Sequence, residues 1–206
     1  MKTLVPLLFL AIGLTATAPT SDAKPINFDF TAVVASVEHP VFPSINVGDL
    51  VIGQYVFESR TPDSDPGDPT RGLYLSGGRF DAKIGALNFS FPLSFIEVLH
   101  NYGGAIIDRY TVAAVNGNTL IELTLLDDVH PTAFKDDSLP LVPPPLTAFY
   151  SKQFQVFVRN PPNPDFIARI NANVVTLVPE PGTLILVAFG LAMLAVTAIW
   201  SKGRRI

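Results

Sequence analysis

The chain of 206 residues contains no cysteine, and only one tryptophan and two methionines. The absence of cysteine rules out disulfides, but a domain of this size can bury a sufficient core without them, so export to an oxidising compartment stays open. Charged residues make up only 16% of the chain, and acidic residues outnumber basic ones by 18 to 14, giving a formal net charge of -4. This acidic balance argues against a nucleic-acid partner.

Recognisable catalytic motifs are absent from the sequence as well. It contains no Gly-x-Ser-x-Gly elbow, no Walker loop and no dinucleotide fingerprint. The three histidines, His39, His100 and His130, lie far apart, whereas zinc ligands usually come in closely spaced pairs. The acidic pairs Asp127–Asp128 and Asp136–Asp137 are interpreted as surface charge rather than as catalytic carboxylates. We therefore expect no enzymatic activity and no cofactor.

Residues 24–177 have the length of one domain. The whole chain has a hydrophobic content of 48% and contains 15 phenylalanines, which is too apolar for a disordered stalk. Apolar residues alternate with polar ones in many short segments, and no long segment before residue 183 has the 3.6-residue period of a helix. The segments expected to be strands are 26–31, 50–57, 80–84, 87–91, 95–99, 109–115, 119–125, 154–158 and 166–177. This pattern predicts an all-β domain, an antiparallel β-sandwich of which a jelly roll is one form.

Turn-forming residues separate these segments. The Asn116-Gly117 dipeptide is a strong hairpin signal, because both residues tolerate a positive φ. Two longer loops, 60–71 and 136–146, are rich in Asp and Pro, and the second is expected on the surface in polyproline II conformation. Residues 160–165 are expected to form a stiff turn between strands.

Two groups of residues within this domain are candidate binding sites. Asp63, Asp65 and Asp68 lie in one loop and are calcium-type oxygen ligands, but the bidentate Glu of a complete calcium loop is missing, so a solvated turn is the alternative. Tyr55, Tyr74, Tyr102 and Tyr110 are candidates for a carbohydrate-binding face, with packing in the core or in hairpins as the alternative. Neither assignment follows from the sequence alone.

The N-terminus has the layout of a secretory signal peptide. Lys2 provides a positive start, residues 4–14 are apolar, and small residues follow. Cleavage after Ala18 would place Pro19 first, which suits a signal peptidase poorly. We therefore expect residues 1–23 to be removed by cleavage after Ala23. An uncleaved N-terminal anchor is the alternative.

The C-terminus has three consecutive parts. Pro179, Glu180 and Pro181 lie in an extended break, since each proline disfavours the helical conformation of the residue before it. Residues 183–200 then contain no charge, and as a helix they would cover about 27 Å, close to the roughly 30 Å of a bilayer core. A basic stop, Lys202, Arg204 and Arg205, follows the span. This order predicts a transmembrane helix with its C-terminus in the cytoplasm and its N-terminus outside.

Residues 178–206 resemble the PEP-CTERM sorting signal of Gram-negative bacteria, through Pro179-Glu180-Pro181, the apolar span and the terminal Arg204-Arg205. Gly182 departs from the family pattern, in which Ser is common after the second proline. The resemblance implies processing by a membrane-embedded protease, exosortase, and delivery from the inner membrane to the cell surface. It also implies an association with extracellular polysaccharide. The segment 48–57, with its Gly-Asp start, resembles a strand of many such ectodomains and implies a β-sandwich without known activity.

Three classes of function follow from these observations. We expect an exported, non-enzymatic surface or matrix protein that carries a C-terminal sorting and anchoring signal. The alternatives are a membrane-anchored module that binds polysaccharide or another ligand, and an enzyme of unrecognised type.

Overall fold

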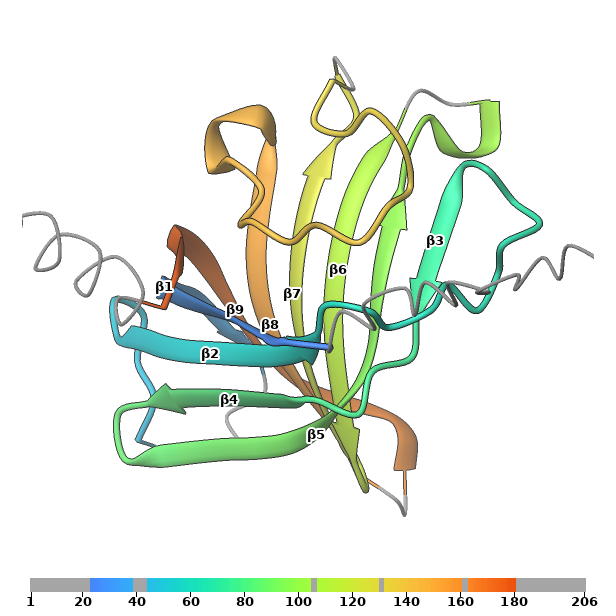
Figure 1. Cartoon of the computed structure of the whole chain (residues 1–206). Coiled ribbons are helices and arrows are strands. Elements are labelled where there is room, and N and C mark those ends of the chain that lie inside the picture. Colours follow the sequence, from blue (N-terminus) through green and yellow to red (C-terminus); the bar gives the residue numbers. More distant parts are fainter. Residues whose placement is uncertain (1–22, 39–43, 105–106, 130–131, 161–162, 181–206) are drawn as a thin grey trace, which may run out of the picture.

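The computed structural model describes residues 23–38, 44–104, 107–129, 132–160 and 163–180. These residues form β-strands and two single-turn 3₁₀-helices, η1 (Tyr102–Gly104) and η2 (Leu146–Ala148). The expected all-β class is confirmed. The strands are β1 (Pro25–Glu38), β2 (Leu50–Glu58), β3 (Arg71–Tyr74), β4 (Arg79–Ile84), β5 (Leu87–Leu99), β6 (Asp108–Asn116), β7 (Thr119–Asp127), β8 (Ser151–Asn160) and β9 (Asn163–Pro179), as Figure 1 shows.

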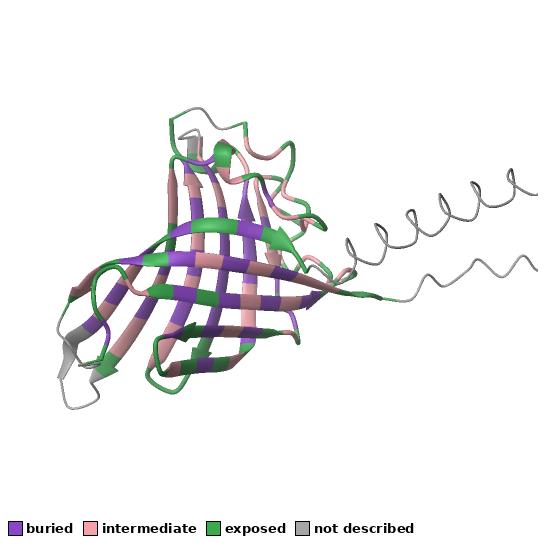
Figure 2. Cartoon of the chain, turned by 90° about the vertical axis from the view of Figure 1, so that its left-hand side faces the viewer, coloured by how far each residue is buried: buried purple, intermediate pink, exposed green. Residues whose placement is uncertain are grey.

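Several strands bury every second side chain. In β2, Val51, Gly53, Tyr55 and Phe57 are buried, and the residues between them are exposed or half-buried. β1, β4 and β7 show the same alternation over most of their length (Figure 2), whereas Ile96–Leu99 of β5 and Tyr110–Ala114 of β6 are buried on both faces. Since successive side chains of a strand point to opposite faces, one face of the sheet supplies the core and the other meets solvent.

The strands form one antiparallel sheet that closes on itself. The order of neighbours is β3-β5-β4-β2-β1-β9-β8-β7-β6, and β6 also pairs with β5. Because β5 pairs with both β4 and β6, the eight strands other than β3 form a closed barrel, and β3 is added beside β5. β2 and β4 cross β6, β7 and β8 at a steep angle in Figure 1. The expected sandwich of two separate sheets is therefore wrong.

The closure depends on a bend in β5. Its first half pairs with β4, ending at the pair Arg79–Pro92, and its second half pairs with β6 from Leu93 onward. A register shift between Leu93 and Phe95 marks a bulge, which bends a strand and increases its twist. The sequence pattern suggested two strands interrupted at Pro92. In the structure, one strand passes through Pro92 and changes partner there.

The expected hairpin between β6 and β7 is confirmed. Asn116 pairs with Thr119, so Gly117 and Asn118 form a two-residue loop. Gly117 has a φ of 57°, whereas neither asparagine has a positive φ. A glycine with positive φ at the first central position is the arrangement of a type II′ turn, whose twist matches that of the flanking strands.

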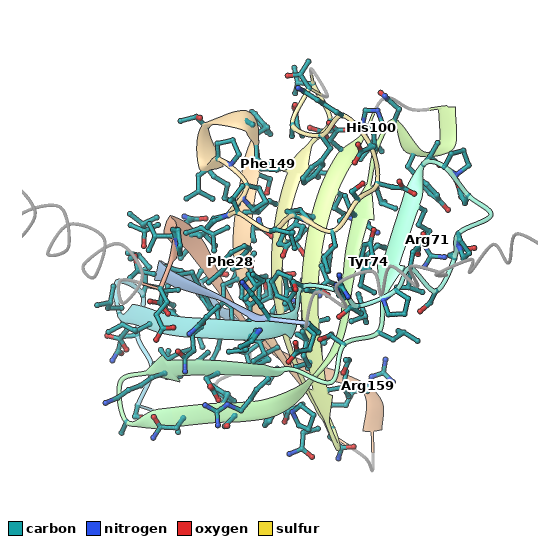
Figure 3. All side chains as sticks on the ribbon, in the orientation of Figure 1. Phe28, Arg71, Tyr74, His100, Phe149 and Arg159 are labelled. Atoms are coloured by element: carbon teal, nitrogen blue, oxygen red, sulfur yellow. The ribbon has the colours of Figure 1, made fainter. Side chains whose placement is uncertain are left out.

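Aromatic side chains fill the barrel interior. Phe28, which is labelled in Figure 3, is one of them. It packs edge-on against Tyr55 and Phe57, with ring centroids 5.5 Å apart in both pairs. Phe30 lies against the inward face of Gly53, where a Cβ atom would collide with its ring. Glycine is therefore required at position 53 by packing. The largest fully buried aromatic residues are Phe28, Phe30, Tyr55, Phe57, Phe80, Tyr110 and Phe154.

The connection between β7 and β8 contributes to this core. Phe149 is buried, and Phe134 packs against both Phe149 and Tyr110, with centroids 5.7 and 6.4 Å apart. Leu141 and Val142, between these phenylalanines, are exposed, but Pro144 is buried, so the expected surface position holds for only part of the proline-rich loop. The connection thus crosses from the core to the surface and back.

Candidate functional site

The four tyrosines do not form a carbohydrate-binding face. Tyr55 and Tyr110 are fully buried, and their hydroxyl groups lie 3.1 Å apart in the barrel interior. Burial raises the pKa of both phenols. Tyr74 is also buried, and its hydroxyl donates to the carbonyl of Asp137 at 2.8 Å. Of these four tyrosines only Tyr102 is exposed, so the core-packing interpretation holds for the other three and a shared stacking face is excluded.

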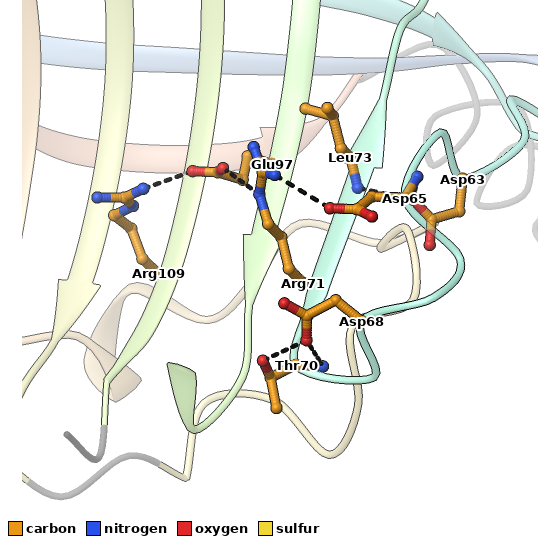
Figure 4. A network of polar contacts seen from close by, with 8 residues as sticks. All are labelled: Asp63, Asp65, Asp68, Thr70, Arg71, Leu73, Glu97 and Arg109. Atoms are coloured by element: carbon orange, nitrogen blue, oxygen red, sulfur yellow. Dashed lines mark hydrogen bonds and ion pairs between the residues drawn. The ribbon is translucent and has the colours of Figure 1, made fainter. Parts of the chain in front are cut away.

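The acidic loop before β3 uses its carboxylates to hold its own backbone (Figure 4). Asp63 Oδ1 accepts hydrogen bonds from the backbone N–H groups of Asp65 and Leu73, each at 2.9 Å. Asp68 Oδ1 accepts from the N–H and hydroxyl of Thr70, which lowers the pKa of Asp68. Asp63, Asp65 and Asp68 therefore serve different partners. In the part of the chain that the structure describes, no three acidic, His or Cys side chains gather in a way that would hold a metal ion.

An ion-pair network joins β3 to the barrel. Glu97 of β5 is 8% exposed and receives Arg71 Nε at 2.9 Å on one carboxylate oxygen and Arg109 Nη2 on the other. Arg71 also contacts Asp65 at 3.1 Å. The sequence analysis missed this network, although a glutamate between the apolar residues of 95–99 was its signal. Its place across three adjacent strands indicates a structural role.

His100 contacts a buried carboxylate. His100 and Phe149 lie toward the same end of the barrel (Figure 3). Asp108, which is fully buried, accepts hydrogen bonds from His100 Nδ1 at 3.1 Å, Asn101 N–H at 3.2 Å and Phe134 N–H at 2.9 Å. His100 Nε2 is 2.8 Å from the side-chain amide of Asn101. The carboxylate therefore ties β6 to two connections, again a structural arrangement. His39 and His130 lie outside the described residues.

The acidic pairs are only partly at the surface. Asp128 and Asp136 are exposed as expected, but Asp127 is 6% exposed and lies opposite Asp108 in the β6–β7 ladder. Two inward-pointing carboxylates thus face the same end of the barrel. The sequence pattern did not distinguish Asp127 from Asp128, although only one of them continues the inward face of β7.

A groove of about 480 Å³ lies on the outer face of β9, β1, β2, β4 and β5. The strand register places ten of its lining residues in two rows of outward-pointing residues that run across the strands, with the inward-facing Phe30, Gly53, Ala82 and Phe89 between the rows. The first row is Val178, Asp29, Gln54, Asp81 and Ser90. The second row is Thr176, Thr31, Ile52, Lys83 and Asn88. Only the register brings these residues together, because the sequence separates them by up to about 150 positions.

Some polar groups of the groove bond to one another, and others do not. Gln54 Nε2 donates to Asp81 at 3.1 Å, and the hydroxyls of Thr31 and Thr176 are 2.8 Å apart. Within the described ranges, no side chain or backbone group hydrogen-bonds to the side chains of four lining residues, namely Asp29, Lys83, Asn88 and Ser90. Burial, with a smaller contribution from the negative charge of Glu180, raises the pKa of Asp29. The groove therefore holds open hydrogen-bonding capacity.

The predicted sorting motif begins inside the folded domain. Pro179 is the last residue of β9 and pairs with Phe28, and the N–H of Glu180 donates to the carbonyl of Asn27 at 3.2 Å. Pro181, the predicted span 183–200 and the basic residues Lys202, Arg204 and Arg205 lie outside the described residues, as does nearly all of the predicted signal peptide. Within the described ranges, no helix has the length and apolar character needed to cross a membrane.

Comparison of the chain with protein-family models, with curated proteins and with solved structures found no match.

Proposed function

We propose that the protein is an exported, non-enzymatic domain that a single C-terminal span holds in the inner membrane until an exosortase-type protease delivers it to the cell surface or matrix. The observation that carries this proposal is the order of Pro179-Glu180-Pro181, the uncharged residues 183–200 and the basic stop at Lys202, Arg204 and Arg205. A rigid break, a span and cytoplasmic positive charges are what a membrane-retained sorting intermediate needs.

The ends of the folded domain fit this proposal. β9 completes the closed sheet at Pro179, and Glu180 directly after it is exposed. At the other end, the backbone N–H of Lys24 donates to Ser59 Oγ at 3.0 Å, and β1 starts one residue later. Cleavage after Ala23 would leave an amino group at Lys24 that can still donate to Ser59. The sheet thus needs nothing of the predicted signal peptide, and of the predicted sorting segment 178–206 it uses Val178 and Pro179 in β9.

The second candidate function is ligand binding by the anchored domain, with extracellular polysaccharide as the ligand. The groove over β9, β1, β2, β4 and β5 favours it, because several polar groups there lack a partner among the described residues. This candidate is compatible with sorting, since the groove and the span are separate parts of the chain.

The sorting proposal is tested with Glu180→Ala. The substitution keeps both prolines and the backbone hydrogen bond to Asn27, and the span still inserts because insertion depends on its own hydrophobicity. We expect the variant to accumulate at full length in the inner membrane of cells that carry an exosortase, whereas the wild-type protein is shortened and leaves that fraction. Immunoblots of fractionated cells measure both quantities.

Glu58→Ala is a suitable control, because Glu58 is also an exposed glutamate at the end of a strand. This control should be processed like the wild-type protein. Identical size and location of wild type and Glu180→Ala would contradict the sorting proposal and favour a plain single-pass anchor.

A further inference from the structure

We infer that the outer groove over β9, β1, β2, β4 and β5 binds an extended, uncharged, polyhydroxylated chain, that is, a segment of neutral polysaccharide. This inference deepens the ligand-binding candidate and rests on the proposed export, because such chains are found outside the cell. The groove thus replaces the four tyrosines as the suggested binding site, because three of those tyrosines are buried in the core.

The shape of the groove suits a chain rather than a compact ligand. Its lining comes from five neighbouring strands, and strands in a sheet are about 4.8 Å apart, so the rows extend over roughly 19 Å. Along the strands the lining is only two residue rows wide. A long and narrow site of this kind accommodates several consecutive units of a linear polymer.

The open groups of the groove are both donors and acceptors. Asp29 offers only acceptors, Lys83 offers only donors, and Asn88 and Ser90 offer both. Asp29 and Ser90 belong to one row and Lys83 and Asn88 to the other, so each row offers both donors and acceptors. Each hydroxyl group of a sugar is donor and acceptor at once, and can therefore satisfy either kind.

Ile52 and Val178 add apolar surface between the polar groups. They are 55% and 44% exposed. The carbon-bound face of a sugar ring can cover such side chains while its hydroxyls reach the polar groups. Aromatic stacking is therefore not required of this site.

The charges of the groove disfavour other polymers. Asp29 and Asp81 oppose one lysine, and Arg79 lies 2.8 Å from Asp81, so the site has no excess of positive charge to hold phosphates or uronic acids. An extended peptide binds best at a strand edge, where backbone N–H and C=O groups are free. Here the peptide would meet a sheet face, whose backbone groups already pair with neighbouring strands.

The test uses the full-length protein in detergent micelles and isothermal titration calorimetry. The probes are hexasaccharides of neutral β-linked glucose and of mannose, a uronic-acid hexasaccharide, and an uncharged extended peptide. We expect at least one neutral hexasaccharide to bind, and the uronic-acid probe and the peptide to bind at least about tenfold more weakly. Asp29→Asn should weaken the neutral probe about tenfold, because a hydrogen bond to a charged acceptor is lost.

Glu122→Gln is the matched control, because Glu122 is a half-buried carboxylate on β7, outside the groove. It should leave the affinity unchanged. Asp29 has no hydrogen-bond partner among the described residues, so Asp29→Asn should keep the unfolding midpoint of the wild type, and a folding defect can be distinguished from lost binding.

Three results would overturn the inference: no binding of either neutral probe, equal affinities for wild type and Asp29→Asn, or tighter binding of the peptide or the acidic probe. The measurement needs no exosortase. A failure here would therefore leave the sorting proposal intact, and a failure of the Glu180→Ala experiment would leave this binding result intact.

Discussion

Asp108 is predicted to be the most sensitive polar position of the barrel. Replacing it with Ala removes the acceptor of two backbone N–H groups, those of Asn101 and Phe134, and of the His100 ring. A buried donor left without a partner costs about 1–3 kcal/mol. Removing the carboxylate also relieves the cost of its own burial, which offsets part of this loss. We expect a net loss of about 3 kcal/mol, a large fraction of the roughly 5–15 kcal/mol of a typical domain.

The assay is urea unfolding of the full-length protein in detergent, followed by the near-ultraviolet circular dichroism of the buried tyrosines. With a slope of about 2 kcal/mol per M, the midpoint should fall by roughly 1.5 M. Asp108→Asn should lose about half as much, because Oδ1 can still accept from His100 and Asn101 while the N–H of Phe134 loses its acceptor. Asp128→Ala, an exposed neighbour of the buried Asp127, should stay within about 0.5 kcal/mol of wild type. If Asp108→Ala lost no more than Asp128→Ala, the reasoning that Asp108 holds these connections in place would be refuted.

Gly53→Ala should lower the unfolding free energy by about 2 kcal/mol or more, because its Cβ would collide with the Phe30 ring and lie 2.8 Å from the carbonyl of Asp81. Urea unfolding measures this loss, and unchanged stability would mean that the core can shift at no cost. Alkaline pH should also destabilise the barrel. Burial raises the pKa of Tyr55 and Tyr110, so the unfolded state, with phenols near pKa 10, releases these protons first and unfolding becomes easier as the pH rises above about 10. The urea concentration at the unfolding midpoint should decrease as the pH is raised from about 9 to 11. A variant with Phe at both positions should show a smaller decrease.

The local structure of this chain could be predicted from its sequence. The alternation of Val51, Tyr55 and Phe57 with outward residues identified β2, and the Asn116-Gly117 dipeptide identified the hairpin between β6 and β7. These signals work because a period of two and a positive φ are properties of a few consecutive residues.

The closure of the sheet could not be predicted in the same way. It depends on whether β5 bends at Pro92 and changes its pairing partner from β4 to β6. A proline in a strand pattern is equally consistent with the end of the strand. The four-residue strand β3 was missed because Arg71–Tyr74 is too short for a period to be recognised, and it is fixed by Glu97, which lies 26 residues further along the chain than Arg71.

The groove is a property of register rather than of any segment. Asp29, Gln54, Asp81 and Ser90 are unremarkable outward residues of four strands, and only their alignment across the sheet makes them neighbours. For a related reason the sequence left two interpretations of the tyrosines open. An aromatic residue on a strand fits a stacking face or a core equally well until the curvature of the sheet is known.

The pairing of β1 with β9 determines when the barrel can form. The hydroxyls of Thr31 and Thr176, which meet across these strands, are 145 residues apart in the chain. β1 is synthesised first, and one of its two edges has no partner until the last strand is available. Contacts of such long sequence separation slow folding, and an unpaired edge is prone to join other chains in the meantime. The chain is therefore most prone to aggregate with other chains in the interval between the synthesis of β1 and that of β9.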